Sequence, residues 1–252
     1  MKVLEKIVSE TKKYIGTIKA IDKDELQQNN KDFISAIVNK KIAIIAELKA
    51  KSPSEGVICE DYQPLKLAKL YEKGGACCIS VLTDQAFFNG SFDDLKLVSE
   101  NIHLPTLCKD FIIDKRQVYL ARESGASACL LIVRILSDKQ LVELKSEIES
   151  LGMTALIEIF DQEDLTRALK VNPKLIGINN RNLDSLKMDM NNATNLSSHL
   201  PKETVVLSLS GAKTAEDIYR TACQFDGILV GTLLMRSEKP DMTLSAVVNQ
   251  MG

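Results

Sequence analysis

The sequence predicts an α/β protein: a single (β/α)8 barrel, or TIM barrel, with extra N-terminal helices. Short apolar runs alternate with amphipathic stretches eight times along the chain, and strands that alternate with helical patterns indicate parallel βαβ units. A length of 252 residues fits one large barrel. No linker rich in Gly, Ser or Pro divides the chain. We therefore expect residues 1–41 to form a helical extension and residues 42–252 the barrel, together in one domain.

The extension reads as one or two helices that cover the barrel or shape its mouth. Its first helix places apolar side chains on roughly one face: Val3, Leu4, Ile7, Val8, Tyr14 and Ile15. Strands are then expected at 42–50, 76–83, 104–110, 127–136, 153–160, 173–181, 204–211 and 226–235. The helices that follow them are expected at 63–75, 91–102, 114–126, 137–152, 161–171, 189–199, 212–224 and 240–251.

The composition excludes several classes of protein. Lys and Arg (32) nearly balance Asp and Glu (34), so no overall charge favours nucleic acid or a membrane surface, and a small ligand is expected. The charged N-terminus lacks the apolar core of a signal peptide, which predicts a cytoplasmic location. The six cysteines show neither a C-x-x-C pair nor metal spacing, and the chain has two histidines. We expect mostly reduced, buried cysteines and no metal.

Polar residues end several of the expected strands. Parallel strands covered on both faces should be almost wholly apolar, and barrel active sites lie at the C-terminal strand ends. The residues concerned are Glu47, Lys49, Lys109, Asp110, Glu158, Asn179, Asn180, Arg181, Ser208 and Ser210. Burying such charges together is costly unless pairing or ligand chemistry offsets it. The pattern predicts an active site with shifted pKa values, suited to proton transfer.

Two glycine-containing segments predict an anion site. Ser210 and Gly211 precede a helix, and Gly231 and Thr232 end the last strand. Glycine lets backbone amides approach an anion, and barrels commonly bind phosphate after strands seven and eight. Ser52 and Arg181 are placed to reach the same anion.

Phenylalanines follow the second and third strands. Phe87 and Phe88 lie in "DQAFFNGSFDDL", and Phe111 follows Lys109. Phenylalanines in such loops either cap the core or form a wall for an aromatic substrate ring. The sequence pattern leaves both interpretations open.

Seven stretches together resemble the indole-3-glycerol phosphate synthase family over nearly the whole chain. They are "IAELKAKSPSEG", "SVLTDQAFFNGSFDDL", "LPTLCKDF", "CLLIVRIL", "ALIEIFDQEDL", "IGINNRNL" and "LVGTLLM". The resemblance implies a cofactor-free and metal-free carbon–carbon lyase of tryptophan biosynthesis. Such a lyase converts 1-(2-carboxyphenylamino)-1-deoxyribulose 5-phosphate to indole-3-glycerol phosphate by ring closure, decarboxylation and dehydration.

The resemblance also implies catalytic roles. Lys109 would be the general acid that protonates the substrate carbonyl, and Glu158 would act in the proton transfers of dehydration. Lys49 would anchor the substrate carboxylate, Glu47 would hold the ammonium groups and Asn179 would hydrogen-bond the substrate. Because desolvation and neighbouring cations lower the pKa of a lysine, we expect a lowered pKa for Lys109.

The binding residues implied by the resemblance fall into two groups. The phosphate-binding group is Ser52, Arg181, Ser210, Gly211, Gly231 and Thr232. The group lining the anthranilate pocket is Phe88, Phe111 and Leu130. As partners we expect the small phosphorylated substrate, with no nucleic acid or membrane, in a monomer or weak homo-oligomer. Association with other tryptophan-pathway enzymes stays open.

One residue departs from the family pattern. The seventh strand usually ends in Glu-Ser-Gly, but here Leu209 replaces the glutamate. This leaves two outcomes open: an active enzyme with a retuned mechanism, or a degenerate phosphate-binding barrel with weak or altered activity. A further alternative is phosphoribosylanthranilate isomerase, which would use a cysteine and an aspartate at strand ends. Cys108 and Asp110 flank Lys109 and are expected to point away from it.

Overall fold

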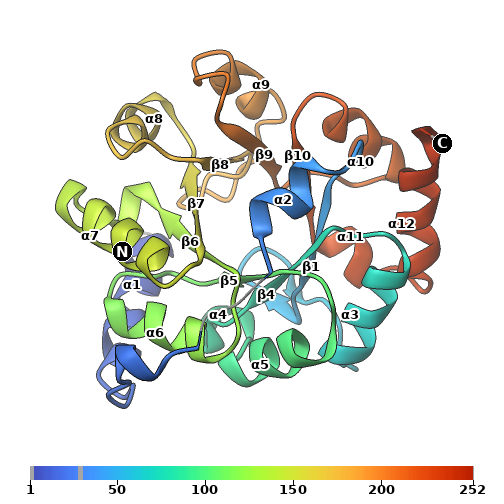
Figure 1. Cartoon of the computed structure of the whole chain (residues 1–252). Helices are drawn as coiled ribbons and strands as arrows, with labels where there is room; N and C mark the ends of the chain where they lie inside the picture. Colours follow the sequence, from blue (N-terminus) through green and yellow to red (C-terminus); the bar gives the residue numbers. More distant parts are fainter. Residues whose placement is uncertain (1–2, 28–30, 252) are drawn as a thin grey trace.

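A computed structural model, which describes residues 3–27 and 31–251, confirms the predicted fold class. Eight parallel strands close into a barrel in the order β1-β10-β9-β8-β7-β6-β5-β4, with β4 paired to β1 (Figure 1). They are β1 (Ile44–Leu48), β4 (Cys78–Leu82), β5 (Thr106–Lys109), β6 (Ala128–Ile132), β7 (Thr154–Ile159), β8 (Leu175–Asn179), β9 (Val205–Leu209) and β10 (Gly227–Val230). Residues 1, 2 and 28–30 of the expected helical extension (1–41) and residue 252 of the expected barrel (42–252) lie outside the described part of the chain.

Helices surround the barrel, as Figure 1 shows. They are α3 (Pro64–Lys73), α5 (Phe92–Asn101), α6 (Lys115–Glu123), α7 (Asp138–Ser150), α8 (Gln162–Leu169), α9 (Asn192–Ser197), α10 (Ala215–Ala222) and α12 (Pro240–Val248). Local sequence fixes several of their starts. Capping boxes begin α7 at Ser137 and α10 at Thr214, because the side chains there satisfy free backbone N–H groups. Pro64 opens α3, at a position where its missing N–H costs nothing.

The core has two layers. One lies between the strands and the helices and includes Ile79, Cys108 and Leu131. The other fills the barrel interior and includes Leu107, Leu130 and Leu156. Because side chains alternate along a strand, consecutive residues such as Leu130 and Leu131 enter different layers. This alternation decides which polar side chains at the strand ends point into the barrel.

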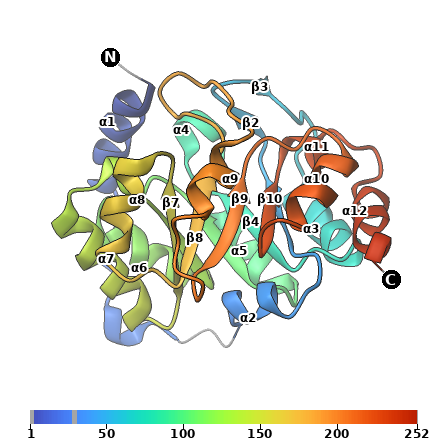
Figure 2. The same cartoon turned by 90° about the horizontal axis from the view of Figure 1, so that it is seen from above.

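The N-terminal helices α1 (Val3–Ile15) and α2 (Phe33–Val38) lie at opposite ends of the barrel, as Figure 2 shows. Helix α2 crosses the N-terminal end, where Phe33 and Ile37 are fully buried in the interior layer. Helix α1 lies at the mouth, and its Leu4 and Ile7 join the same layer. The 3-10 helix η1 (Lys23–Glu25) lies between them in the sequence.

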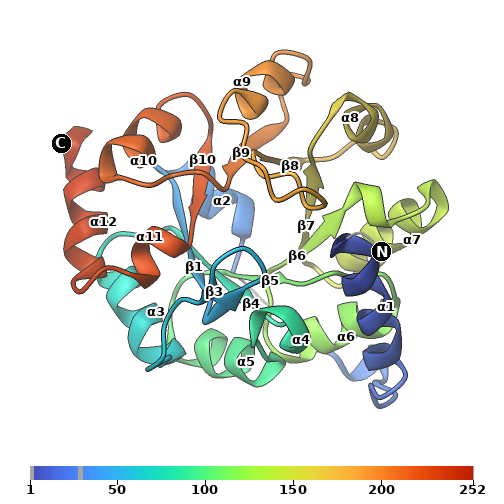
Figure 3. The ribbon, with the colours of Figure 1, turned by 180° about the vertical axis from the view of Figure 1, so that it is seen from behind.

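Several short elements interrupt the expected pattern. A hairpin of β2 (Lys51–Ser52) and β3 (Gly56–Val57) follows β1, and α4 (Gln85–Phe88) follows β4; both lie at the mouth in Figure 3. The apolar run 226–235 was expected to be one strand, but it ends as a strand at Val230 and continues as α11 (Thr232–Met235). The 3-10 helices η2 (Val133–Ile135) and η3 (Asn249–Met251) complete the described elements. Within the described ranges, no helix is long and apolar enough to cross a membrane.

Candidate active site

Two lysine–glutamate pairs lie at the C-terminal ends of the strands. Lys49 Nζ is 3.0 Å from Glu47 Oε1, and both side chains come from β1 and the residue just after it. Lys109 Nζ at the end of β5 is 3.5 Å from Glu158 Oε2 in β7. The Glu47 and Glu158 side chains are 7% and 2% exposed. Since buried charges are tolerated when paired, the two pairs form a nearly balanced ionic cluster.

The pKa values within this cluster follow from its charges. Burial opposes ionisation of Glu47, but the ammonium groups of Lys49 and Lys109 outweigh it and lower the Glu47 pKa. Burial likewise opposes the charged form of Lys109, yet Glu158 and Glu47 outweigh it and raise the Lys109 pKa. The expected lowering of the Lys109 pKa is therefore wrong. Two carboxylates face the ammonium group, so Lys109 carries its proton throughout the neutral pH range.

Asn179 has a fixed side-chain orientation beside this cluster. Its Nδ2 donates to Glu158 Oε1 at 3.0 Å, and its Oδ1 accepts from the Arg181 N–H at 2.9 Å. Because each end of the amide has a different partner, the amide group has one favourable orientation. Asn179 thus holds the Glu158 carboxylate from the side away from Lys109.

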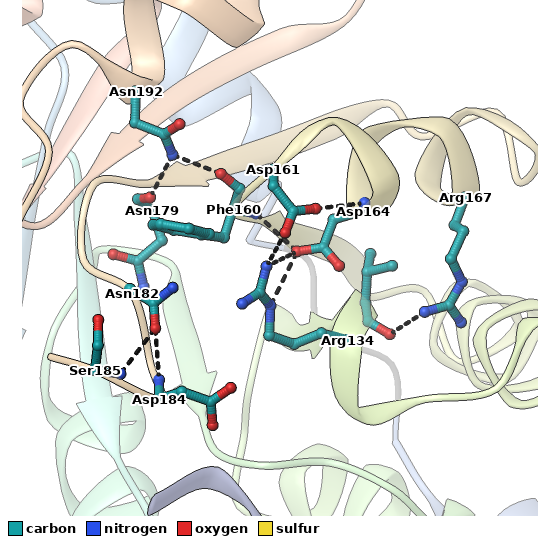
Figure 4. A network of polar contacts seen from close by, with 11 residues as sticks. Arg134, Phe160, Asp161, Asp164, Arg167, Asn179, Asn182, Asp184, Ser185 and Asn192 are labelled. Atoms are coloured by element: carbon teal, nitrogen blue, oxygen red, sulfur yellow. Dashed lines mark hydrogen bonds and ion pairs between the residues drawn. The ribbon is translucent and has the colours of Figure 1, made fainter. Parts of the chain in front are cut away.

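A second polar network supports these strand ends from outside (Figure 4). Asn192 Nδ2 donates to the carbonyl oxygens of Phe160 (2.7 Å) and Asn179 (2.9 Å), and so links the ends of β7 and β8. Arg134 pairs with Asp161 at 2.9 Å and with Asp164, while its guanidinium lies 4.9 Å from the centre of the Phe160 ring. The network fixes the backbone that carries Glu158 and Asn179.

One cavity of about 480 Å³ opens at this end of the barrel. Of the predicted site residues, it is lined by Glu47, Lys49, Ser52, Phe88, Lys109, Phe111, Asn179, Arg181, Ser210, Gly211, Gly231 and Thr232. Glu158 does not line it but contacts Lys109 and Asn179, which do. The structure thus brings together residues from both halves of the sequence.

The residues predicted to bind phosphate gather around tight turns. Ser210 (φ 67°) and Gly211 (φ 112°) both have left-handed backbone conformations, which are rare for a serine. A Cβ at Gly211 would lie 2.7 Å from Met190 Sδ, the end of a flexible side chain that can move, so the left-handed φ is what favours glycine here. A Cβ at Gly231 would lie 2.6 Å from Glu47 Oε1 and 3.2 Å from Lys49 Nζ. Gly231 thereby brings the backbone after β10 close to the ionic cluster.

Apolar side chains form the remaining wall of the cavity. The Phe88 and Phe111 rings lie 6.0 Å apart at 36°, a spacing typical of interacting aromatic pairs. Leu130 was expected in this wall but is not among the lining residues. It pairs in register with Leu156, two residues below Glu158, and is packed in the interior layer. Ile132, level with Glu158, occupies the higher position on that strand.

Other polar residues at the strand ends face outward. Asp110 accepts hydrogen bonds from the Thr83 hydroxyl (2.8 Å) and the Phe111 N–H (2.7 Å). Asn180 Nδ2 donates to Ser208 Oγ at 3.1 Å. Asp110, Asn180 and Ser208 do not line the cavity, and Cys108 packs in the outer core layer. The positions of Cys108 and Asp110 therefore do not favour the isomerase alternative.

The sequence interpretation missed several lining residues. They are Glu55, Lys213 and Arg236, with the apolar residues Val3, Ile7, Leu183, Leu186 and Met188. Lys213 and Arg236 closely follow the two glycine segments in the sequence, and that proximity could have indicated further cations at the anion site. Val3 and Ile7 are distant in sequence from the strand ends that form the cavity. They line it because α1 packs at the mouth.

Comparisons with known proteins agree with this architecture. A family model described as "Indole-3-glycerol phosphate synthase" matches residues 4–247. The chain is 40% identical to the indole-3-glycerol phosphate synthase of Trichodesmium erythraeum over 98% of this chain and 89% of that protein. It is 42% identical to that of Lacticaseibacillus paracasei over 88% of this chain and 86% of that protein.

Two further similarities concern a longer relative and the fold. The tryptophan biosynthesis protein TrpCF of Helicobacter pylori is 42% identical over 84% of this chain and 47% of that protein. The crystal structure of 3-hexulose-6-phosphate synthase from Salmonella typhimurium matches with a TM-score of 0.63 at 12% identity, over 83% of this chain and 100% of that one. The latter supports the barrel fold alone.

Proposed function

Because the chain belongs to the indole-3-glycerol phosphate synthase family, we propose that its cavity converts 1-(2-carboxyphenylamino)-1-deoxyribulose 5-phosphate to indole-3-glycerol phosphate. This is a carboxy-lyase reaction of tryptophan biosynthesis that releases carbon dioxide and water. The observation that carries the proposal is the meeting of Lys109 and Glu158 at 3.5 Å, next to a cavity that also has cationic and aromatic walls.

In the first step, we assign Lys109 as the general acid. As the aromatic carbon attacks the substrate carbonyl, the ammonium group of Lys109 donates a proton to the carbonyl oxygen. Its raised pKa keeps it protonated for this role. Loss of carbon dioxide then restores the aromatic ring. Lys49 anchors the departing carboxylate in this proposal, and Glu47, 3.0 Å away, holds Lys49 in place.

In the second step, we assign Glu158 to the proton transfers of dehydration. Asn179 fixes one carboxylate oxygen of Glu158, and Lys109 lies near the other. A base held from both sides needs little reorganisation during the reaction. We assign the phosphate to Ser52, Arg181, Ser210, Gly211, Gly231 and Thr232, and the anthranilate ring to Phe88 and Phe111.

The test is a turnover assay with the purified chain. Incubation with the carboxyphenylamino-deoxyribulose phosphate should give the fluorescence of an indole product. Lys109→Ala should lose turnover by at least about 10²- to 10⁴-fold while inorganic phosphate still binds. Lys66→Ala, at an exposed position of α3, is the matched control. Absence of product from the wild type would refute the proposed function, and near-normal turnover of Lys109→Ala would refute its role.

The association with other tryptophan-pathway enzymes and the cytoplasmic location stay predictions. Similarity to part of a longer tryptophan biosynthesis protein supports association with enzymes of that pathway. The degenerate-barrel alternative is not favoured, because relatives at 40–44% identity are named synthases.

A further inference from the structure

Glu55 places a carboxylate among the cations of the anion site. It lies in the turn of the β2–β3 hairpin, which crosses the barrel mouth in Figures 2 and 3. Glu55 Oε2 is 3.1 Å from Arg236 Nη2, and Oε1 is 3.8 Å from Arg181 Nη2. The Thr232 hydroxyl donates to Oε1 at 3.4 Å. The side chain is 22% exposed. Arg181 follows β8, and Thr232 and Arg236 follow β10, so the hairpin contacts two other parts of the cavity rim.

These contacts balance the charge of the Glu55 carboxylate but give it few good hydrogen bonds. The distances to Arg181 and Thr232 are long for a carboxylate, which normally accepts charged hydrogen bonds at about 2.7–2.9 Å. Although Glu55 Oε2 lies near Arg236, it is buried and accepts no hydrogen bond from any described residue. The arginine and hydroxyl groups therefore keep donor capacity that this carboxylate does not use.

A phosphate would use that capacity more fully. It has a charge of about −1.5 to −2 at neutral pH and three acceptor oxygens, and arginine matches it with paired hydrogen bonds. Arg181 and Thr232 are also the groups assigned above to the substrate phosphate. Glu55 and a bound phosphate would therefore require the same partners, with like charges side by side.

We propose that the Glu55 carboxylate is an internal competitor for the phosphate site, and that a substrate phosphate binds by displacing it. This inference rests on the phosphate site of the proposed function. Glu55 makes the site selective. An anion that binds the two arginines more weakly than phosphate does cannot displace the Glu55 carboxylate from Arg236 and Arg181. The displacement also frees the hairpin tip, whose strands have only two residues each and so little stability of their own.

The test is Glu55→Gln, which keeps the side-chain size and removes the charge. Inorganic phosphate should bind to this variant about tenfold more tightly than to the wild type, a change equal to ~1.4 kcal/mol. The KM for the carboxyphenylamino-deoxyribulose phosphate should fall by a similar factor while kcat does not rise. Glu60→Gln, at an exposed position after the hairpin, is the matched control and should change neither value. Thermal melting verifies that each variant is folded.

Two results would overturn the inference. Weaker phosphate binding by Glu55→Gln would mean that Glu55 orients the arginines instead of competing with the ligand. Unchanged binding would mean that Glu55 does not share the site. The phosphate titration needs no turnover. If the wild type forms no indole product but Glu55→Gln binds phosphate more tightly, the proposed function fails while the competition stands.

Discussion

Asp110 predicts a specific dependence of stability on pH. Asp110 is 5% exposed, and burial raises the pKa of its carboxyl to about 6, although the hydrogen bond from Thr83 opposes the rise. The unfolded chain has the ordinary value of 3.8. Between these values the folded state binds more protons than the unfolded state, so stability falls as pH rises through this window. A difference of about two pKa units corresponds to ~3 kcal/mol.

Asp110→Asn removes this titration. The free energy of unfolding of the variant minus that of the wild type should rise by about 2.4 kcal/mol between pH 4 and pH 7, because at pH 4 part of the titration of the unfolded state already lies below this range. Urea unfolding at several pH values measures it, since the difference cancels the titration of other groups. Asp93→Asn, at an exposed position of α5, provides the control. A difference for Asp110→Asn that stays constant with pH would refute the reasoning.

Three further predictions concern the ionic cluster and its support. Glu47→Gln removes a charge that raises the Lys109 pKa, so the basic limb of the pH–rate profile should move to lower pH; an unmoved limb would contradict Lys109 as the acid. Leu209→Glu should not increase kcat. It should lower the free energy of unfolding, measured with urea, by ~2–5 kcal/mol, because position 209 is 1% exposed. A large gain in rate would show that the wild type is impaired at this position. Asn192→Ala frees the carbonyl of Asn179 and should lower kcat about tenfold with KM nearly unchanged, in steady-state kinetics; a rise in KM alone would exclude a positioning role.

The barrel could be predicted from sequence because its signal repeats. Eight apolar runs, each followed by an amphipathic stretch, leave few other folds. The error at 226–235 has a local cause. Apart from Asp226 and Thr232, the run consists of apolar residues and glycines, so its pattern does not separate strand from helix. The backbone changes direction at Gly231, with φ −116° and ψ −80°. The hairpin of β2 and β3 was missed because its two-residue strands show no alternation.

The sequence predicts the site residues where the alternation of a strand fixes the direction of a side chain. It does not predict how residues of different strands and loops affect one another. Polar residues at strand ends identified Lys109 and Glu158, whose chain positions differ by 49 residues. The direction of the Lys109 pKa was wrong because it depends on Glu47 and Glu158, which belong to two other strands. Arg236 and Glu55 face the cavity from loops, where no periodic pattern indicates which way a side chain points.

The charge balance explains how the site accommodates Leu209. Each ammonium group already has a carboxylate partner: Lys49 has Glu47 at 3.0 Å, and Lys109 has Glu158 at 3.5 Å. Leu209 pairs in register with Asn179 and packs so closely that a Cβ on Gly177 would lie 2.6 Å from its Cδ1. A carboxylate there would be a third negative charge beside two positive ones, and an unpaired buried charge is costly. The leucine therefore fits a site in which both ammonium groups already have carboxylate partners, and we expect turnover with leucine at this position.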